Sequence, residues 1–202
     1  MSDYNEDSIR SLQWNVHLRE RPGMYIGKLG DGSEPDDGIY VLLKEVIDNS
    51  IDEFMRGYGR NIEVTIKDSQ VSVRDYGRGM PLGKVIDCVA RINTGGKFDD
   101  QAYDTAIGMN GVGVKAVNAL STMFFVSSVV NGKKKSARFS AGEIVEDFPI
   151  CETDEHNGTF ISFLPDDKLF ENFHWYGEHV ERLLWNYAYL NPGLTLNCNG
   201  KD

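Results

Sequence analysis

The sequence predicts an α+β fold, a two-layer sandwich in which helices cover one face of a mixed, mostly antiparallel sheet. Two observations carry this prediction. Segments with helical periodicity and segments with strand-like alternation are grouped along the chain, whereas doubly wound folds alternate them strictly. The chain has 202 residues, of which 41% are hydrophobic, and this is enough for one large domain with a sizeable core.

The first half of the chain carries most of the expected helices. Apolar residues recur at helical spacing in the longest of them, which Gly57 and Gly59 end. In order, the patterns predict a helix at 8–18, a turn at 21–27, a loop at 30–38, a long helix at about 39–56, a β-hairpin at 62–73, a helix at about 82–91, a glycine-rich loop, and a helix at about 112–120.

The second half turns to strands. Their apolar residues alternate with polar ones or form short runs bounded by turn residues. The expected elements are strands at 123–130, 133–140, 143–148 and 158–164, a helix near 174–189 and a final strand at 194–198. Residues 1–7 are polar, and we expect them to form an arm that a partner could order.

Charge and cysteine content exclude several kinds of function. The formal net charge is −10 and the pI is about 4.9, and such an acidic surface repels phosphate backbones, so direct gripping of nucleic acid is disfavoured. Cys88, Cys151 and Cys198 are widely spaced, which indicates reduced thiols in a cytosolic protein. The N-terminal residues do not resemble a signal peptide, and no apolar run is long enough to span a bilayer.

The stretch "EVIDNSIDE" places several acids on a helix that otherwise looks built for a core. Glu45, Asn49 and Glu53 recur at every fourth residue, so their side chains share one face of the helix. One interpretation is a solvated polar face. The other is a face that holds a cation or an attacking water, because carboxylate and amide oxygens suit Mg²⁺. Asp48 and Asp52 fall off this face, and the sequence assigns them no chemical role.

The hairpin carries a second unusual acid. Val71, Val73 and Asp75 lie on one side of a strand by period two, so Asp75 continues a buried face and needs a hydrogen-bond donor there. The "DYGRGMP" segment that follows supplies chain freedom through Gly77 and Gly79. The alternative is a turn at a strand end in which the aspartate only caps its own backbone.

A glycine-rich segment is the strongest of the three signals. "GGK" at 95–97 and "GMNGVGVKAVNALS" at 108–121 place glycines before a helix start, where exposed backbone N–H groups suit phosphates. The spacing matches neither the Rossmann fingerprint nor a P-loop, so a bound nucleotide would be held by another design. A flexible connection is the competing interpretation. The histidines lack metal-ligand spacing.

Six segments in a fixed order resemble the ATPase domain of bacterial type IIA topoisomerases. That class is the B subunit of DNA gyrase or topoisomerase IV, within the GHKL superfamily, and it implies the Bergerat fold. The first and fourth segments separate it from MutL, the large heat-shock chaperone and sensor histidine kinases. The segments are "RPGMYIG", "EVIDNSIDE", "DYGRGMP", "GGKFDDQAY", "GMNGVGVKAVNALS" and "GTFISFLP".

The resemblance implies a role for each matching residue. Glu45 would be the general base that activates the attacking water, Asn49 would hold Mg²⁺ between the phosphates, and Asp75 would accept a hydrogen bond from the adenine amino group. Arg78 would pair with Glu53 beneath the adenine. The further residues implied for nucleotide binding are Tyr4, Val46, Val73, Gly79, Met80, Pro81, Tyr103, Gly108, Met109, Asn110, Gly111, Val112, Gly113, Val114, Thr159 and Ile161, and Lys97 would join Glu45 in catalysis.

The resemblance also implies an organisation and partners. Residues 1–202 would be a single N-terminal ATPase domain, with an N-terminal dimerisation arm at 1–15, cut from a longer protein that has transducer and cleavage-core domains. Expected partners are ATP with Mg²⁺, a second copy of the same subunit, competitive ATP-site inhibitors, and the A subunit and DNA through regions outside this chain, in the bacterial cytoplasm near the nucleoid. The "GMNGVGVKAVNALS" segment favours topoisomerase IV over gyrase. The alternatives are a non-hydrolysing sensor or kinase module and a MutL-like clamp.

Overall fold

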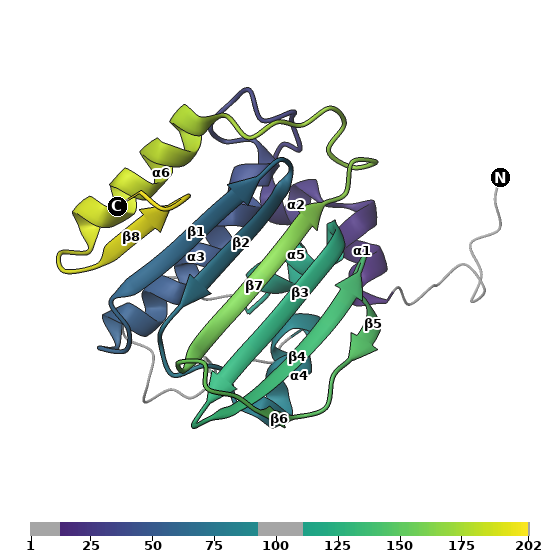
Figure 1. Cartoon of the computed structure of the whole chain (residues 1–202). Coiled ribbons are helices and arrows are strands. Elements are labelled where there is room, and N and C mark those ends of the chain that lie inside the picture. The colour runs from purple at the N-terminus through teal and green to yellow at the C-terminus, as the bar shows by residue number, and fades with distance from the viewer. Residues whose placement is uncertain (1–12, 93–110, 202) are drawn as a thin grey trace, which may run out of the picture.

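The computed structural model describes residues 13–92 and 111–201. Within these ranges the chain forms an eight-stranded mixed sheet with the order β5-β4-β3-β7-β2-β1-β8, and β6 pairs with β4. Every neighbouring pair is antiparallel except β1 and β8, which run parallel (Figure 1). The predicted mixed, mostly antiparallel sheet is therefore confirmed.

The elements follow the predicted order closely. The strands are β1 (Asn61–Lys67), β2 (Gln70–Asp75), β3 (Ser121–Val130), β4 (Lys133–Ser140), β5 (Glu143–Asp147), β6 (Cys151–Glu152), β7 (Gly158–Pro165) and β8 (Thr195–Cys198). The helices are α1 (Trp14–Glu20), α2 (Gly23–Ile26), α3 (Gly38–Met55), the 3₁₀ turn η2 (Leu82–Lys84), α4 (Val85–Ala90), α5 (Gly113–Ala119) and α6 (Gly177–Leu190).

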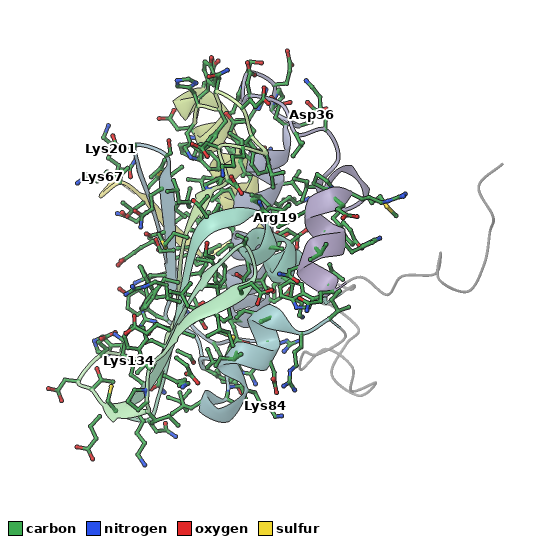
Figure 2. The ribbon with its side chains drawn as sticks, turned by 90° about the vertical axis from the view of Figure 1, so that its right-hand side faces the viewer. Arg19, Asp36, Lys67, Lys84, Lys134 and Lys201 are labelled. Carbon is green, nitrogen blue, oxygen red and sulfur yellow. The ribbon has the colours of Figure 1, made fainter. Side chains whose placement is uncertain are left out.

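The helices pack against one face of the sheet, as Figure 2 shows with the sheet seen edge-on. The long helix α3 lies behind β1 and β2 in Figure 1 and buries its apolar stripe completely, with Leu43, Ile47 and Ile51 at 0% exposure. Val64 of β1 and Val71 of β2 meet this stripe from the sheet and are equally buried. The core therefore lies between the two predicted layers, and it fixes which face of α3 remains for chemistry.

Three local predictions needed correction. The turn expected at 21–27 contains the one-turn helix α2, which Pro22 opens with a helical φ of −60°. The helix expected near 174 begins at Gly177, since Tyr176 before it has an extended backbone with φ −82° and ψ 119°. The two-residue strand β6 carries no pattern that alternation could reveal. Across the described ranges, no helix has both the length and the apolar character required to cross a membrane.

Candidate active site

The acidic face of α3 meets the start of α5 at Glu45. Glu45, Asn49 and Glu53 are all partly buried, so this face is not the freely solvated surface that one interpretation of the sequence allowed. A Cβ atom at Gly113, the first residue of α5, would overlap the Glu45 carboxylate. Glycine at 113 therefore lets the helix that follows the glycine-rich segment approach the Glu45 carboxylate directly.

Asn49 has its amide nitrogen engaged and its oxygen left for a ligand. The Nδ2 group donates to the Glu45 backbone carbonyl at 2.8 Å, one turn earlier on α3. The donor set within 13–92 and 111–201 contains no cluster of three or more His, Cys, Asp or Glu side chains able to hold a metal by themselves. One amide oxygen fits Mg²⁺ in the mode in which substrate phosphates and water supply the other ligands.

Asp75 closes β2 as a buried carboxylate, with 6% of its surface exposed. Its Oδ1 accepts hydrogen bonds from the backbone N–H groups of Gly77 at 2.9 Å and Thr159 at 3.1 Å. Antiparallel pairing of β2 with β7 brings Thr159 to this position, and a Cβ at Gly158 would overlap the Asp75 carbonyl. Burial raises the pKa of Asp75 to about 6, although the two backbone donors act in the opposite direction.

The second oxygen of Asp75 faces α3. The Ser50 hydroxyl lies 3.4 Å from Asp75 Oδ2 and 3.5 Å from the Val46 carbonyl. Ser50 was missed in the sequence, although it follows Val46 by one turn and so had to lie on the buried side of α3. Asp75 therefore keeps acceptor capacity at Oδ2 for a further hydrogen bond.

Arg78 contacts Glu53 of α3 and Tyr58, which follows that helix. Its Nη2 and Nε donate to the Glu53 carboxylate at 2.9 and 3.1 Å, and its backbone N–H adds a third contact at 3.1 Å. Its guanidinium lies 4.2 Å from the centre of the Tyr58 ring. Burial would raise the Glu53 pKa, but the hydrogen bonds and charge of Arg78 outweigh it and lower that pKa. Tyr58, in a loop without periodicity, was not anticipated.

The turn after β2 is fixed to β3. The hydroxyl of Ser128 accepts from the Met80 N–H at 2.7 Å and donates to the Met80 carbonyl at 2.8 Å. Gly79 has a φ of +78°, and a Cβ there would lie 2.6 Å from the Val129 carbonyl, so both its conformation and its surroundings require glycine. Val46, Val73 and Ile161, at 2%, 2% and 5% exposure, provide buried apolar surface in the same core.

The remaining expected residues divide between two groups. Gly111 and Val112 directly precede α5, Gly113 and Val114 begin it, and Gly111 has a φ of +60°. Tyr4, Lys97, Tyr103, Gly108, Met109 and Asn110 lie outside the described residues. Asp48 and Asp52, which the sequence left without a role, are buried at 6% and 5% exposure.

These features match an ATPase family. The family model described as "Histidine kinase-, DNA gyrase B-, and HSP90-like ATPase" matches residues 35–168, so the chain belongs to that family. This range includes every element that contributes to the site above, from α3 to β7. The predicted resemblance and the ATP-binding class are thereby confirmed.

Individual relatives narrow the similarity further. The chain is 50% identical over 197 residues to the B subunit of DNA topoisomerase 4 from Borreliella burgdorferi, covering 98% of this chain and 33% of the relative. It is 37% identical to the B subunit of the type 2 topoisomerase from Aquifex aeolicus, covering 94% of this chain and 24% of the relative. It is also 37% identical to the B subunit of DNA gyrase from Rickettsia conorii, covering 96% and 25%. The chain thus spans a quarter to a third of these relatives' lengths.

Proposed function

We propose that this chain is the ATP-hydrolysing domain of a bacterial type IIA DNA topoisomerase, from the B subunit of topoisomerase IV in preference to that of gyrase. One observation carries the proposal: α3 contacts the buried acceptor Asp75 through Ser50 and also presents the Glu45 carboxylate to the start of α5, with Asn49 one turn after Glu45. The 50% identity to the B subunit of a topoisomerase IV supports the choice between the two enzymes.

The buried end of the site suits adenine. Asp75 Oδ2 would accept a hydrogen bond from the amino group of the base, while Ser50 and the backbone of Thr159 hold the carboxylate in place. Val46, Val73, Met80, Pro81 and Ile161 would line the slot for the ring, and Gly79 allows close approach. Arg78, steadied by Glu53 and Tyr58, would cover the ring's outer side.

The other end of the site suits phosphates and water. Asn49 would hold Mg²⁺, which would supply positive charge to offset the negative charge of the phosphates. Glu45 would take a proton from water as the water oxygen bonds to the γ-phosphorus and the bond to the β-phosphate oxygen breaks, releasing ADP and phosphate. Lys97, Tyr103 and the amides from Gly108 to Gly113 would complete the phosphate site as a lid.

Assembly and partners form part of the same proposal. Nucleotide binding would bring two copies of the B subunit together, with Tyr4 of the arm at 1–15 reaching the partner's nucleotide, and the longer protein would use the A subunit to pass one DNA segment through another in the bacterial cytoplasm. Competitive inhibitors would occupy the adenine end. A non-hydrolysing sensor or kinase module, or a MutL-like clamp, is the competing function, and neither requires DNA strand passage.

The proposal is tested with the full-length protein and its A subunit. We expect ATP turnover that DNA stimulates and ATP-dependent decatenation of interlinked DNA circles, with decatenation exceeding supercoiling. Turnover without any DNA stimulation or strand passage would assign the chain to another branch of the family. Chelation of Mg²⁺ in the same assay should stop turnover, because the phosphates then lack their counter-charge.

Adenine binding is expected to depend on pH through Asp75. The pKa is about 6 without ligand, and a donor from the base stabilises the charged form, so binding lowers this pKa and releases a proton. The affinity should be level above about pH 7 and should weaken toward tenfold per pH unit below about 6. Calorimetric titration with adenosine between pH 5 and 8 measures this, because adenosine lacks phosphates that titrate in the same range. An affinity independent of pH would contradict the role given to Asp75.

A further inference from the structure

The last helix, α6, has one tyrosine that faces inward and another that faces solvent. Val180, Leu184 and Tyr187 recur at helical spacing and are buried at 3%, 6% and 8% exposure. Tyr189, two residues further along, is 77% exposed. Figure 1 shows α6 beside the β8 edge of the sheet, on the side where α3 lies behind β1.

Tyr187 reaches the helix that carries the proposed catalytic residues. Its hydroxyl donates a short hydrogen bond to Oδ1 of Asp48, a residue 139 positions earlier in the chain. Asp48 lies three residues after Glu45 and directly precedes Asn49, so this contact anchors the turn of α3 that holds both. The function proposed above does not use either member of this pair.

The electrostatics of Tyr187 keep it a donor. Burial raises the pKa of the phenol far above its usual range, and the hydrogen bond and charge of Asp48, followed by the charge of Glu45, raise it further. The hydroxyl therefore retains its proton at every working pH.

If the contact between α6 and α3 served only to fill space, an apolar pair would do so without a buried carboxylate and phenol. Burying a carboxylate and a phenol costs free energy that a packed apolar pair avoids, whereas a buried hydrogen bond fixes one relative position of two helices. We propose that Tyr187 is a positioning residue, which through Asp48 holds the Glu45–Asn49 turn of α3 in the geometry required for ATP hydrolysis. This inference rests on the proposed function, since it assigns Tyr187 to the same reaction.

The test compares Tyr187→Phe with the matched control Tyr189→Phe in the full-length protein. Both changes remove one hydroxyl from the same helix, but only the first removes a donor to Asp48. For Tyr187→Phe we expect kcat to fall about fivefold to tenfold with KM within about twofold of the original, the effect of a loosened catalytic turn. Tyr189→Phe should leave both parameters unchanged.

Hydrogen exchange gives a second measurement that does not depend on turnover. Peptides covering 43–52 of α3 should exchange faster in Tyr187→Phe, while peptides from β3 should keep their original rates. Equal acceleration everywhere would indicate general destabilisation and would overturn the positioning role, as would unchanged exchange in α3. An absence of turnover in the original protein would instead overturn the proposed function. The exchange result would still show whether Tyr187 holds this turn of α3 in place.

A third comparison tests the route through Asp48. The double variant Asp48→Ala with Tyr187→Phe should lose no more kcat than the weaker single variant, because without the Asp48 carboxylate the Tyr187 hydroxyl has no acceptor there to lose. Independent losses that multiply in the double variant would show that Tyr187 acts by another route and would overturn the inference.

Discussion

Replacing Glu45 with alanine or glutamine is expected to abolish ATP turnover while nucleotide binding persists. The carboxylate lies at the start of α5, beside Gly113, where a water attacking the terminal phosphate would be placed. General-base groups contribute about a hundredfold to ten-thousandfold to such steps, so kcat should fall at least about a hundredfold. Phosphate release measures turnover, and calorimetry with a non-hydrolysable ATP analogue should give a dissociation constant within about threefold of the original.

The control for this experiment is Glu181→Gln. Glu181 is an exposed carboxylate on α6, and its loss should leave both turnover and binding unchanged. Unchanged turnover in the Glu45 variants would show that another group activates the water and would refute the role of Glu45 as the general base. Loss of both binding and turnover would show that Glu45 contributes to nucleotide binding and not specifically to the hydrolysis step.

Asp75→Asn is expected to remove tight nucleotide binding. The amide oxygen can still accept from Gly77 and Thr159, so the strand end keeps its local structure, but the amide nitrogen would then present a donor to the donor of the base. Mispairing of a buried polar group costs enough to weaken affinity by about a hundredfold or more. Calorimetry with the ATP analogue measures the loss, and near-normal affinity would refute the adenine role.

The same variant should be more stable than the original without ligand. The pKa of Asp75 is raised in the folded state to about 6 from 3.8, so its contribution to stability is complete below the unfolded pKa and is lost as pH rises through about 6. At pH 7.5 the ionised group therefore costs up to about 3 kcal/mol, which asparagine avoids. Denaturant unfolding checks this, with Asp68→Asn in the exposed β1–β2 turn as the matched control.

The sequence predicted those parts of the fold and site that depend on regular residue spacing within one helix or strand. Alternation of period two placed Asp75 inward with Val71 and Val73, and the structure buries all three. Spacing of four residues placed Glu45 and Asn49 on one face of α3, away from its apolar stripe. Both periodicities are set by the backbone of a single element, so no knowledge of neighbouring elements was needed.

Contacts between distant elements could not be predicted in the same way. The close approach of Gly113 to Glu45 depends on how α5 sits against α3, and the Tyr187–Asp48 hydrogen bond depends on where α6 packs. Tyr58 lies in a loop, where periodicity carries no information. The roles expected for Tyr4, Lys97 and the 108–110 segment stay predictions, since those residues lie outside the described part of the chain.

The hydrogen bonds at Asp75 also bear on which nucleoside triphosphate this domain would select. Backbone N–H groups from two different segments donate to Oδ1, so under the proposed function Oδ2 would be the oxygen that meets the incoming base. Guanine carries a carbonyl oxygen where adenine carries its amino group, so GTP would set one acceptor against another at a buried carboxylate. Under the proposed function, the pairing of β2 with β7 would therefore favour ATP over GTP without any contribution from the phosphates.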